Sequence, residues 1–124
     1  MDDTLGVRFA RAVAAKDRPA LLAVLAPDVD FRGLTPGQAW EADRAVDLVG
    51  DILLGQWFEP GDEIRSLESL DDGEVADRHR VTYRMRVVND DGAHLVEQTA
   101  YYDDHAGQIT WMRVVCSGFR PLSG

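Results

Sequence analysis

The chain has 124 residues, of which 45% are hydrophobic, and its formal net charge is −9. This length suits one domain with a single core. An acidic surface repels phosphate backbones, so we expect no nucleic-acid partner. The longest apolar runs, such as residues 20–26, are too short to cross a bilayer, so we expect no membrane partner.

The first residues and the single cysteine indicate the cellular location and exclude some kinds of site. The first five residues include two aspartates where a secretory signal peptide carries positive charge, so we expect a cytoplasmic location. Cys116 is the only cysteine, which excludes an internal disulfide and a cysteine-built metal site. Acidic pairs at 71–72, 90–91 and 103–104 are typical of solvated turns. We therefore expect neither a metal nor a cofactor.

The first half of the chain predicts helices. Apolar residues recur at helical spacing between residues 3 and 15. Asp17 is a typical N-cap and Pro19 lies in the first turn of a second helix, which we expect to stop at Pro27. A short strand at 29–32, a turn at 35–37 and a third helix over about 41–56 follow, with Gly50 weakening that helix.

The second half of the chain predicts strands at residues 64–70, 74–88, 94–102 and 108–116, with hairpin connections at 89–93 and 103–107. Because alternate side chains share a face of a strand, the strand over 74–88 should direct Asp77, His79 and Tyr83 inward. The expected inner sets of the next two strands are His94, Val96, Gln98, Ala100 and Tyr102, and then Thr110, Met112, Val114 and Cys116.

Two segments resemble a known family. Residues 9–31, FARAVAAKDRPALLAVLAPDVDF, resemble the opening of NTF2-like (SnoaL-like) proteins, and residues 104–113, DHAGQITWMR, resemble their last hairpin. The resemblance implies one NTF2-like domain over residues 1–124. It also implies an α+β cone, in which three N-terminal helices pack on a curved, mostly antiparallel sheet around an internal pocket.

The resemblance does not select one activity, because this superfamily includes ketosteroid isomerases, polyketide cyclases, epoxide hydrolases, dehydratases and non-catalytic adaptors. The catalytic groups of ketosteroid isomerase match Phe9, Gly33 and Gln98 in this sequence. The acid of SnoaL-type cyclases matches Val114. The chain therefore departs from both of these chemistries.

Several polar residues remain as candidates for chemistry. His79 oriented by Asp77 would form an acid/base pair, although an exposed His beside a turn acid fits the same pattern. Tyr83 or Tyr102 would donate to a ligand carbonyl, or would be a core tyrosine. Gln98 among apolar neighbours needs a hydrogen-bond partner, which is either a ligand or a backbone carbonyl.

The expected pocket is mainly apolar. Trp40 and Trp57, with Phe58, would either surround its mouth or belong to the ordinary core. The residues expected to contact the ligand are Phe9, Trp40, Trp57, Gln98, Tyr102, Met112 and Val114.

Two functional hypotheses follow. The leading one is a pocket that binds a small hydrophobic molecule, with or without transforming it by cofactor-free acid/base chemistry of the cyclase, isomerase or dehydratase type. His79, Asp77 and Tyr83 would then be the catalytic residues. The alternative is a non-catalytic module for ligand binding or protein interaction, so whether the chain is an enzyme stays open.

The outer face of the sheet predicts a homodimer. Large apolar side chains mix there with arginines, a composition typical of protein interfaces, and NTF2-like proteins commonly dimerise through this face. The residues expected at its centre are Tyr101, Trp111 and Arg113.

Overall fold

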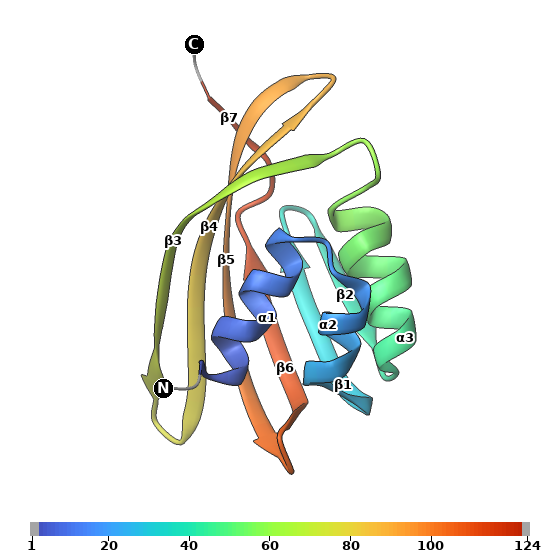
Figure 1. The fold of residues 1–124 in the computed structure, drawn as a ribbon, viewed down its shortest axis with the longest axis vertical. Helices are drawn as coiled ribbons and strands as arrows, with labels where there is room; N and C mark the ends of the chain where they lie inside the picture. The colour runs from blue at the N-terminus through green and yellow to red at the C-terminus, as the bar shows by residue number, and fades with distance from the viewer. Residues whose placement is uncertain (1–2, 123–124) are drawn as a thin grey trace.

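The computed structural model describes residues 3–122, which form helices on one side of a single curved sheet (Figure 1). The strand order is β2-β1-β6-β5-β4-β3, with β7 against β5. Among the strands of residues 3–122, only β1 and β6 pair in parallel. The helices are α1 (Leu5–Ala14), α2 (Arg18–Val24), α3 (Ala45–Asp47) and η1 (Leu48–Trp57), and the strands are β1 (Leu25–Thr35), β2 (Gln38–Ala42), β3 (Glu63–Val75), β4 (Arg78–Asn89), β5 (Gly92–His105), β6 (Gln108–Cys116) and β7 (Arg120–Pro121).

The first two helices begin where the sequence predicts. The Thr4 hydroxyl accepts a hydrogen bond from Val7 N–H at the start of α1. The Asp17 carboxylate accepts one from Ala20 N–H at the start of α2. However, α2 ends at Val24 rather than at Pro27. Pro27 lies inside β1, where the pairing with β6 shifts register, and a proline is tolerated there because its missing N–H leaves no ladder bond broken.

The third helix starts later than predicted because residues 38–42 form a strand. Gly37 has a φ of +77°, which allows a tight turn after Thr35, and β2 then pairs with β1. The helix begins at Ala45 as α3 and continues as the π-helix η1, drawn as one helix in Figure 1. A Cβ on Gly55 would lie 2.5 Å from the Gly50 carbonyl oxygen, so this wide helix leaves no room for a side chain there.

The predicted strands at 64–70 and 74–88 are displaced. β3 runs to Val75, a turn contains Ala76 and Asp77, and β4 begins at Arg78. The pair Asp71 and Asp72 therefore lies within β3 rather than at a turn. Asp77 is an exposed turn residue and not part of the inner strand face.

The predicted inner faces of the last three long strands are confirmed from Val81 onward, except at one position. The buried inner residues are Val81, Tyr83, Met85 and Val87 on β4, His94, Val96, Gln98, Ala100 and Tyr102 on β5, and Ile109, Met112, Val114 and Cys116 on β6. Thr110 is partly exposed because a register shift between β5 and β6 moves it off the inner face.

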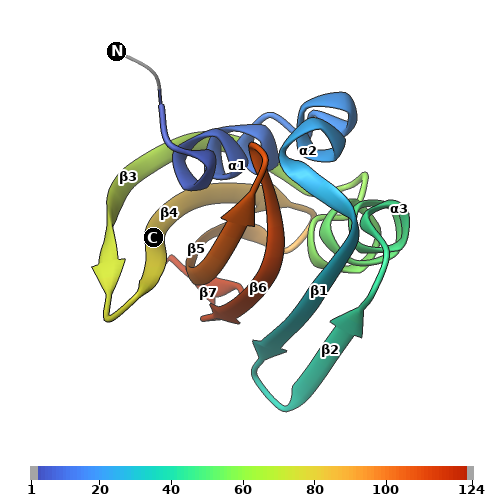
Figure 2. The ribbon, with the colours of Figure 1, turned by 90° about the horizontal axis from the view of Figure 1, so that it is seen from below.

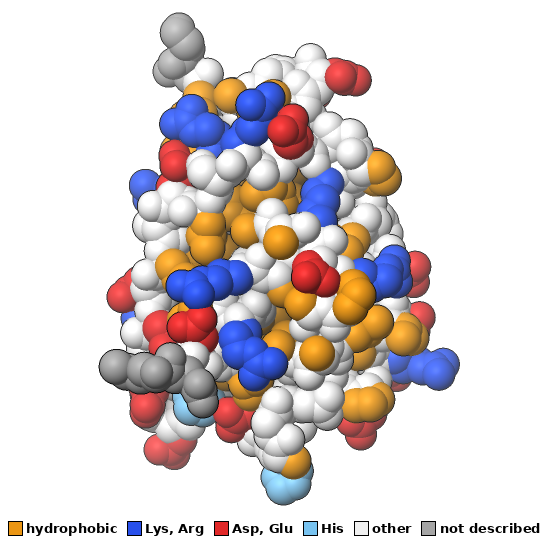
Figure 3. Space-filling view, viewed as in Figure 1, with side chains coloured by type: hydrophobic (Ala, Val, Ile, Leu, Met, Phe, Trp, Pro, Cys, Tyr) orange, Lys and Arg blue, Asp and Glu red, His pale blue; other side chains and the backbone are white. Residues whose placement is uncertain are grey.

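The helices cover the concave side of the sheet, and the end-on view shows how the strands curl around them (Figure 2). On the helix side, hydrophobic side chains show in the centre and charged side chains of both signs surround them (Figure 3). The predicted α+β class is confirmed. Within residues 3–122, no helix is long and apolar enough to cross a membrane.

Candidate functional site

A cavity of about 190 Å³ lies at one end of the concave face. It is bounded by the turn between β1 and β2, the end of η1, the strands β5 and β6, and the segment that follows β6. Four of its lining side chains are aromatic. The lining residues are Thr35, Trp40, Gln56, Trp57, Phe58, Gln98, Cys116, Gly118 and Phe119.

Trp57, the last residue of η1, forms much of the cavity wall. Its ring packs edge-to-face against Phe31, at 5.8 Å between centroids, and against Trp40, at 6.1 Å. Gly33 on β1 leaves room for the Trp57 ring, because a Cβ at position 33 would lie 2.8 Å from Cη2 of Trp57. The Trp40 indole donates to the Thr35 hydroxyl at 2.7 Å, which holds the second tryptophan in place.

A buried polar pair adjoins the cavity. Tyr83 and Gln98 are register partners on β4 and β5, and both are fully buried. The Tyr83 hydroxyl donates to Oε1 of Gln98 at 2.5 Å. Burial raises the pKa of Tyr83, and the neighbouring Cys116 adds to this effect. Tyr83 is therefore a neutral hydrogen-bond donor at any physiological pH.

Two N–H donors in the cavity wall lack an acceptor. Nε2 of Gln98 and Nε1 of Trp57 are buried, and no group among the described residues accepts a hydrogen bond from either. A buried donor without a partner costs about 1–3 kcal/mol. Both belong to residues that line the same cavity, and each nitrogen itself has almost no surface accessible to a water-sized probe.

The segment after β6 closes one side of the cavity. Ser117 N–H donates a hydrogen bond to the Glu97 carbonyl, and Arg120 pairs with Leu95. Between these two pairs, Gly118 and Phe119 lie opposite a single residue of β5, Val96. The resulting bulge includes Gly118, whose φ is +76°. It places the Phe119 ring 6.0 Å from that of Phe58.

The structure brings together three of the seven predicted ligand contacts. Trp40, Trp57 and Gln98 line the cavity. Phe9, Tyr102 and Met112 are buried in the core and do not line it. Val114 is buried on the inner face, does not line the cavity, and also borders a groove on the other side of the sheet. Sequence reasoning missed Phe119, and the signal available for it was Gly118, two residues after the end of a strand.

His79 and Asp77 are not paired. The carboxylate nearest to His79 is that of Asp104, with Nε2 and Oδ1 3.6 Å apart, and each side chain is about two-fifths exposed. The His79 ring also stacks on Tyr102, whose hydroxyl accepts a hydrogen bond from Gly6 N–H. His79 lies four residues before Tyr83 on β4, roughly 13 Å along the strand, so it cannot act on an atom held by Gln98.

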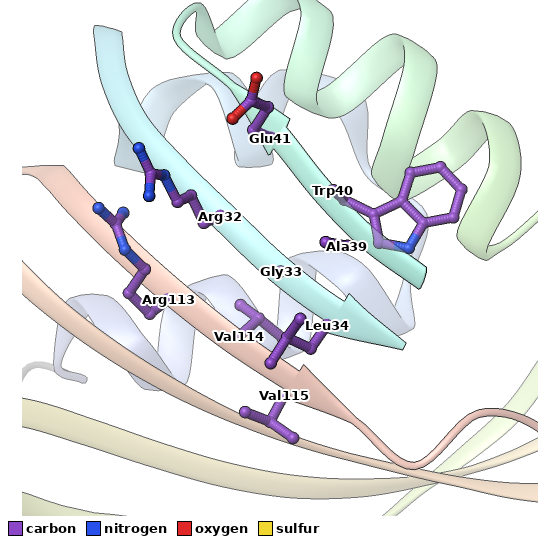
Figure 4. A pocket seen from close by; sticks show the side chains of 9 residues that line it. All are labelled: Arg32, Gly33, Leu34, Ala39, Trp40, Glu41, Arg113, Val114 and Val115. Carbon is purple, nitrogen blue, oxygen red and sulfur yellow. The ribbon is translucent and has the colours of Figure 1, made fainter. Parts of the chain in front are cut away.

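The larger groove lies on the outer face of the sheet and has a volume of about 580 Å³ (Figure 4). Arg32 and Arg113 stand side by side there on β1 and β6. The adjacent pair Leu34 and Val115 is 54% and 52% exposed. Apolar and charged groups of this groove face solvent side by side.

A scan against protein-family models finds no match, and no curated protein matches. Solved structures do match. An NTF2-like protein of unknown function from Burkholderia pseudomallei is 19% identical, with a TM-score of 0.65 over 89% of this chain and 86% of that one. A provisionally assigned polyketide cyclase from Pseudomonas putida is also 19% identical, with a TM-score of 0.65 over 91% of both chains. A provisionally assigned isomerase from Rhodopseudomonas palustris is 15% identical, with a TM-score of 0.68 over 95% and 93%.

These similarities establish the fold. The chain has the NTF2-like fold, as the resemblance of its first helices and last hairpin implies.

Proposed function

We propose that this NTF2-like chain binds a small, mainly apolar molecule in the cavity beside Trp57 and Gln98. The observation that carries the proposal is a cavity with four aromatic walls and a few polar side chains, those of Thr35, Gln56 and Gln98. Small-molecule sites have this composition, a mostly apolar lining with a few polar groups that fix orientation.

The size of the cavity limits the ligand. A cavity of about 150 Å³ accommodates benzene, whereas sites for drug-sized ligands span about 300–1,000 Å³. The cavity beside Trp57 has about 190 Å³. We therefore expect a monocyclic or short-chain molecule rather than a fused polycyclic one.

Acid/base catalysis of the cyclase or isomerase type is the second candidate, and the provisional assignments of two structural neighbours favour it. Binding without catalysis comes first because the nine lining residues include no carboxylate, imidazole or amine that would accept a proton. The sequence-derived candidates His79, Asp77 and Tyr83 are absent from this lining. If His79→Ala and Tyr83→Phe leave ligand-dependent properties unchanged, binding alone is supported.

Native mass spectrometry of the purified protein, beside a denatured control, tests the binding proposal. We expect an extra small mass that denaturation releases. Cys116→Leu adds volume to the cavity lining and should abolish this mass, whereas Val46→Leu enlarges an exposed side chain away from the cavity and should leave it unchanged. A bound mass that persists in folded Cys116→Leu would place the ligand elsewhere.

We also propose that the chain forms a homodimer through the outer face of the sheet. Trp111 lies at its centre, with the guanidinium groups of Arg78 and Arg113 3.7 and 4.3 Å from its ring centroid. Exposed Leu34 and Val115 extend this surface. Sedimentation equilibrium should give a dimer for the unmodified chain and for Trp111→Phe, and a monomer for Trp111→Asp. A dimer that survives Trp111→Asp would refute this interface.

A further inference from the structure

We infer that a flap, residues 117–122, moves away from β5 to admit the ligand, and that Phe119 is the side chain that closes the cavity. This inference rests on the proposed ligand-binding function and describes how that site is reached. It begins from the few contacts that hold the flap to the sheet and from the position of the Phe119 ring.

The flap is attached to β5 mainly at its two ends. At one end, Ser117 N–H donates to the Glu97 carbonyl at 2.8 Å, and the Ser117 hydroxyl accepts from Glu97 N–H. At the other end, Leu122 N–H donates to the Ala93 carbonyl at 3.0 Å. Between these ends, β7 has only two residues, and one of them, Pro121, has no N–H to donate. Because no other described strand pairs with β7, the flap can leave the sheet without breaking the ladder between β5 and β6.

Phe119 is the movable wall of the cavity. Its side chain is partly exposed, and its ring lies 6.0 Å from that of buried Phe58, so it stands between the cavity and solvent. The other aromatic walls are fixed, because Trp57 and Phe58 are buried and the Trp40 indole is held by a hydrogen bond. Displacing Phe119 therefore opens the cavity and leaves its remaining aromatic walls in place.

A buried histidine beneath the flap opposes its closure. His94 is the register partner of Pro121, and its ring lies 5.6 Å from that of Phe119. It is 6% exposed, and its Nδ1 has no hydrogen-bond partner among the described residues. A buried polar atom without a partner costs free energy that hydration would relieve. Burial of the Phe119 ring thus favours the closed state, whereas hydration of His94 favours the open one.

Amide hydrogen exchange tests the flap without any ligand. We expect the amides of Ser117 and Leu122 to exchange at least about tenfold faster than those of Ala100 and Val114, which pair within the ladder between β5 and β6. The two flap amides should share one opening free energy that depends little on urea, because opening exposes little surface. If Leu122 frays alone while Ser117 exchanges only with the ladder, the flap is refuted.

The closed shape of the flap depends on Gly118. Its φ is +76°, and a Cβ there would lie 3.0 Å from Cγ of Pro36 in the turn between β1 and β2. Gly118→Ala should therefore favour the open state and speed the exchange of Ser117 and Leu122 by about tenfold. Gly107→Ala is the matched control, because its φ is +79° and a Cβ there meets no atom within 4 Å. It should leave the ratio of flap exchange to ladder exchange unchanged, and equal effects of the two variants would contradict the inference.

A disulfide tests whether the ligand passes the flap. Leu95 and Arg120 are register partners, and antiparallel partners lie about 4.5–5.5 Å apart at Cα, a distance that a disulfide spans. In Leu95→Cys with Arg120→Cys, the exchange of fluorobenzene is followed by ¹⁹F NMR before and after reduction with dithiothreitol. We expect the oxidised form to exchange this probe at least about tenfold more slowly than the reduced form of the same variant. The unmodified protein, whose Cys116 is buried and free, is the control and should not respond to dithiothreitol.

The outcomes separate this inference from the proposed function. If the oxidised and reduced forms exchange fluorobenzene equally fast, the cavity binds small molecules but fills by another route, and the inference alone is refuted. If fluorobenzene binds neither form, the ligand-binding proposal is refuted, and amide exchange still decides whether the flap opens.

Discussion

The hydrogen bond between buried Tyr83 and Gln98 allows a test of how much this pair contributes to stability. Tyr83→Phe removes the hydroxyl and leaves the whole Gln98 amide buried without a partner, which should cost about 1–3 kcal/mol of unfolding free energy. Gln98→Leu leaves the Tyr83 hydroxyl without its acceptor. This variant also removes an NH₂ group that is already unpaired, so we expect a smaller loss of about 1–2 kcal/mol.

The double variant decides whether this reasoning is right. Replacing both partners by apolar groups of similar shape removes every unsatisfied atom of the pair and is often nearly neutral. We therefore expect Tyr83→Phe with Gln98→Leu to lie within about 1 kcal/mol of the unmodified protein, although the single losses sum to about 2–5 kcal/mol. Urea denaturation measures each free energy, and one kcal/mol corresponds to roughly 4 °C in Tm for a chain of this size.

Additive losses in the double variant would refute this account, since they would mean that the two groups do not depend on each other. Tyr101→Phe is the matched control because Tyr101 is a partly exposed tyrosine on the opposite face of the sheet, and it should change stability by less than about 0.5 kcal/mol.

The same pair has a consequence at high pH. The pKa of Tyr83 is raised by burial, so the folded state keeps this proton above about pH 10, where the unfolded chain loses it. Stability should therefore fall as the pH rises beyond about 10. Tyr83→Phe should make this fall less steep, which pH-dependent denaturation would measure. Part of the fall should remain, because burial raises the pKa of Tyr102 as well.

Substitutions at two tightly packed glycines, each with a control glycine, test the packing by their effect on the free energy of unfolding. Gly33→Ala should cost about 1–3 kcal/mol because its Cβ would lie 2.8 Å from Trp57, whereas Gly61→Ala, which meets no atom within 4 Å, should be close to neutral. Gly55→Ala should be strongly destabilising because its Cβ would lie 2.5 Å from a backbone carbonyl, and Gly50→Ala, whose nearest neighbours lie 3.5 Å away, should be tolerated. Equal stability within either pair would contradict the packing described for η1.

Local signals in the sequence predicted the elements that depend on local chemistry. The Asp17 cap and Pro19 define the start of α2 because both act within one helical turn. Strand alternation identified the inner faces of β4 and β5, including buried Gln98. The predicted third helix over about 41–56 includes residues 41 and 42, which instead end β2 because pairing with β1 overrides their helical preference. The turn at Ala76 and Asp77 places Val75 opposite Arg78 on the outer face, so the alternation predicted through residues 75–79 does not continue across it.

The cavity was predicted only in part for a similar reason. Trp40, Trp57 and Gln98 were recognisable as unusual residues in their local patterns. The pairing of Tyr83 with Gln98 depends on strand register. The position of Phe119 depends on a bulge between two strands. Neither register nor bulge has a signal confined to neighbouring residues, so the unsatisfied donors emerge only from the assembled sheet.

Gly33 and Trp57 are far apart in the sequence, but the Trp57 ring occupies the space that a side chain at position 33 would need. Across homologous sequences we expect the sizes of these residues to vary in opposite directions, so that a larger residue at the strand position accompanies a smaller one at the end of the helix. The same exchange governs redesign. A larger side chain could be installed at position 33 only after the indole at position 57 has been replaced by a smaller group.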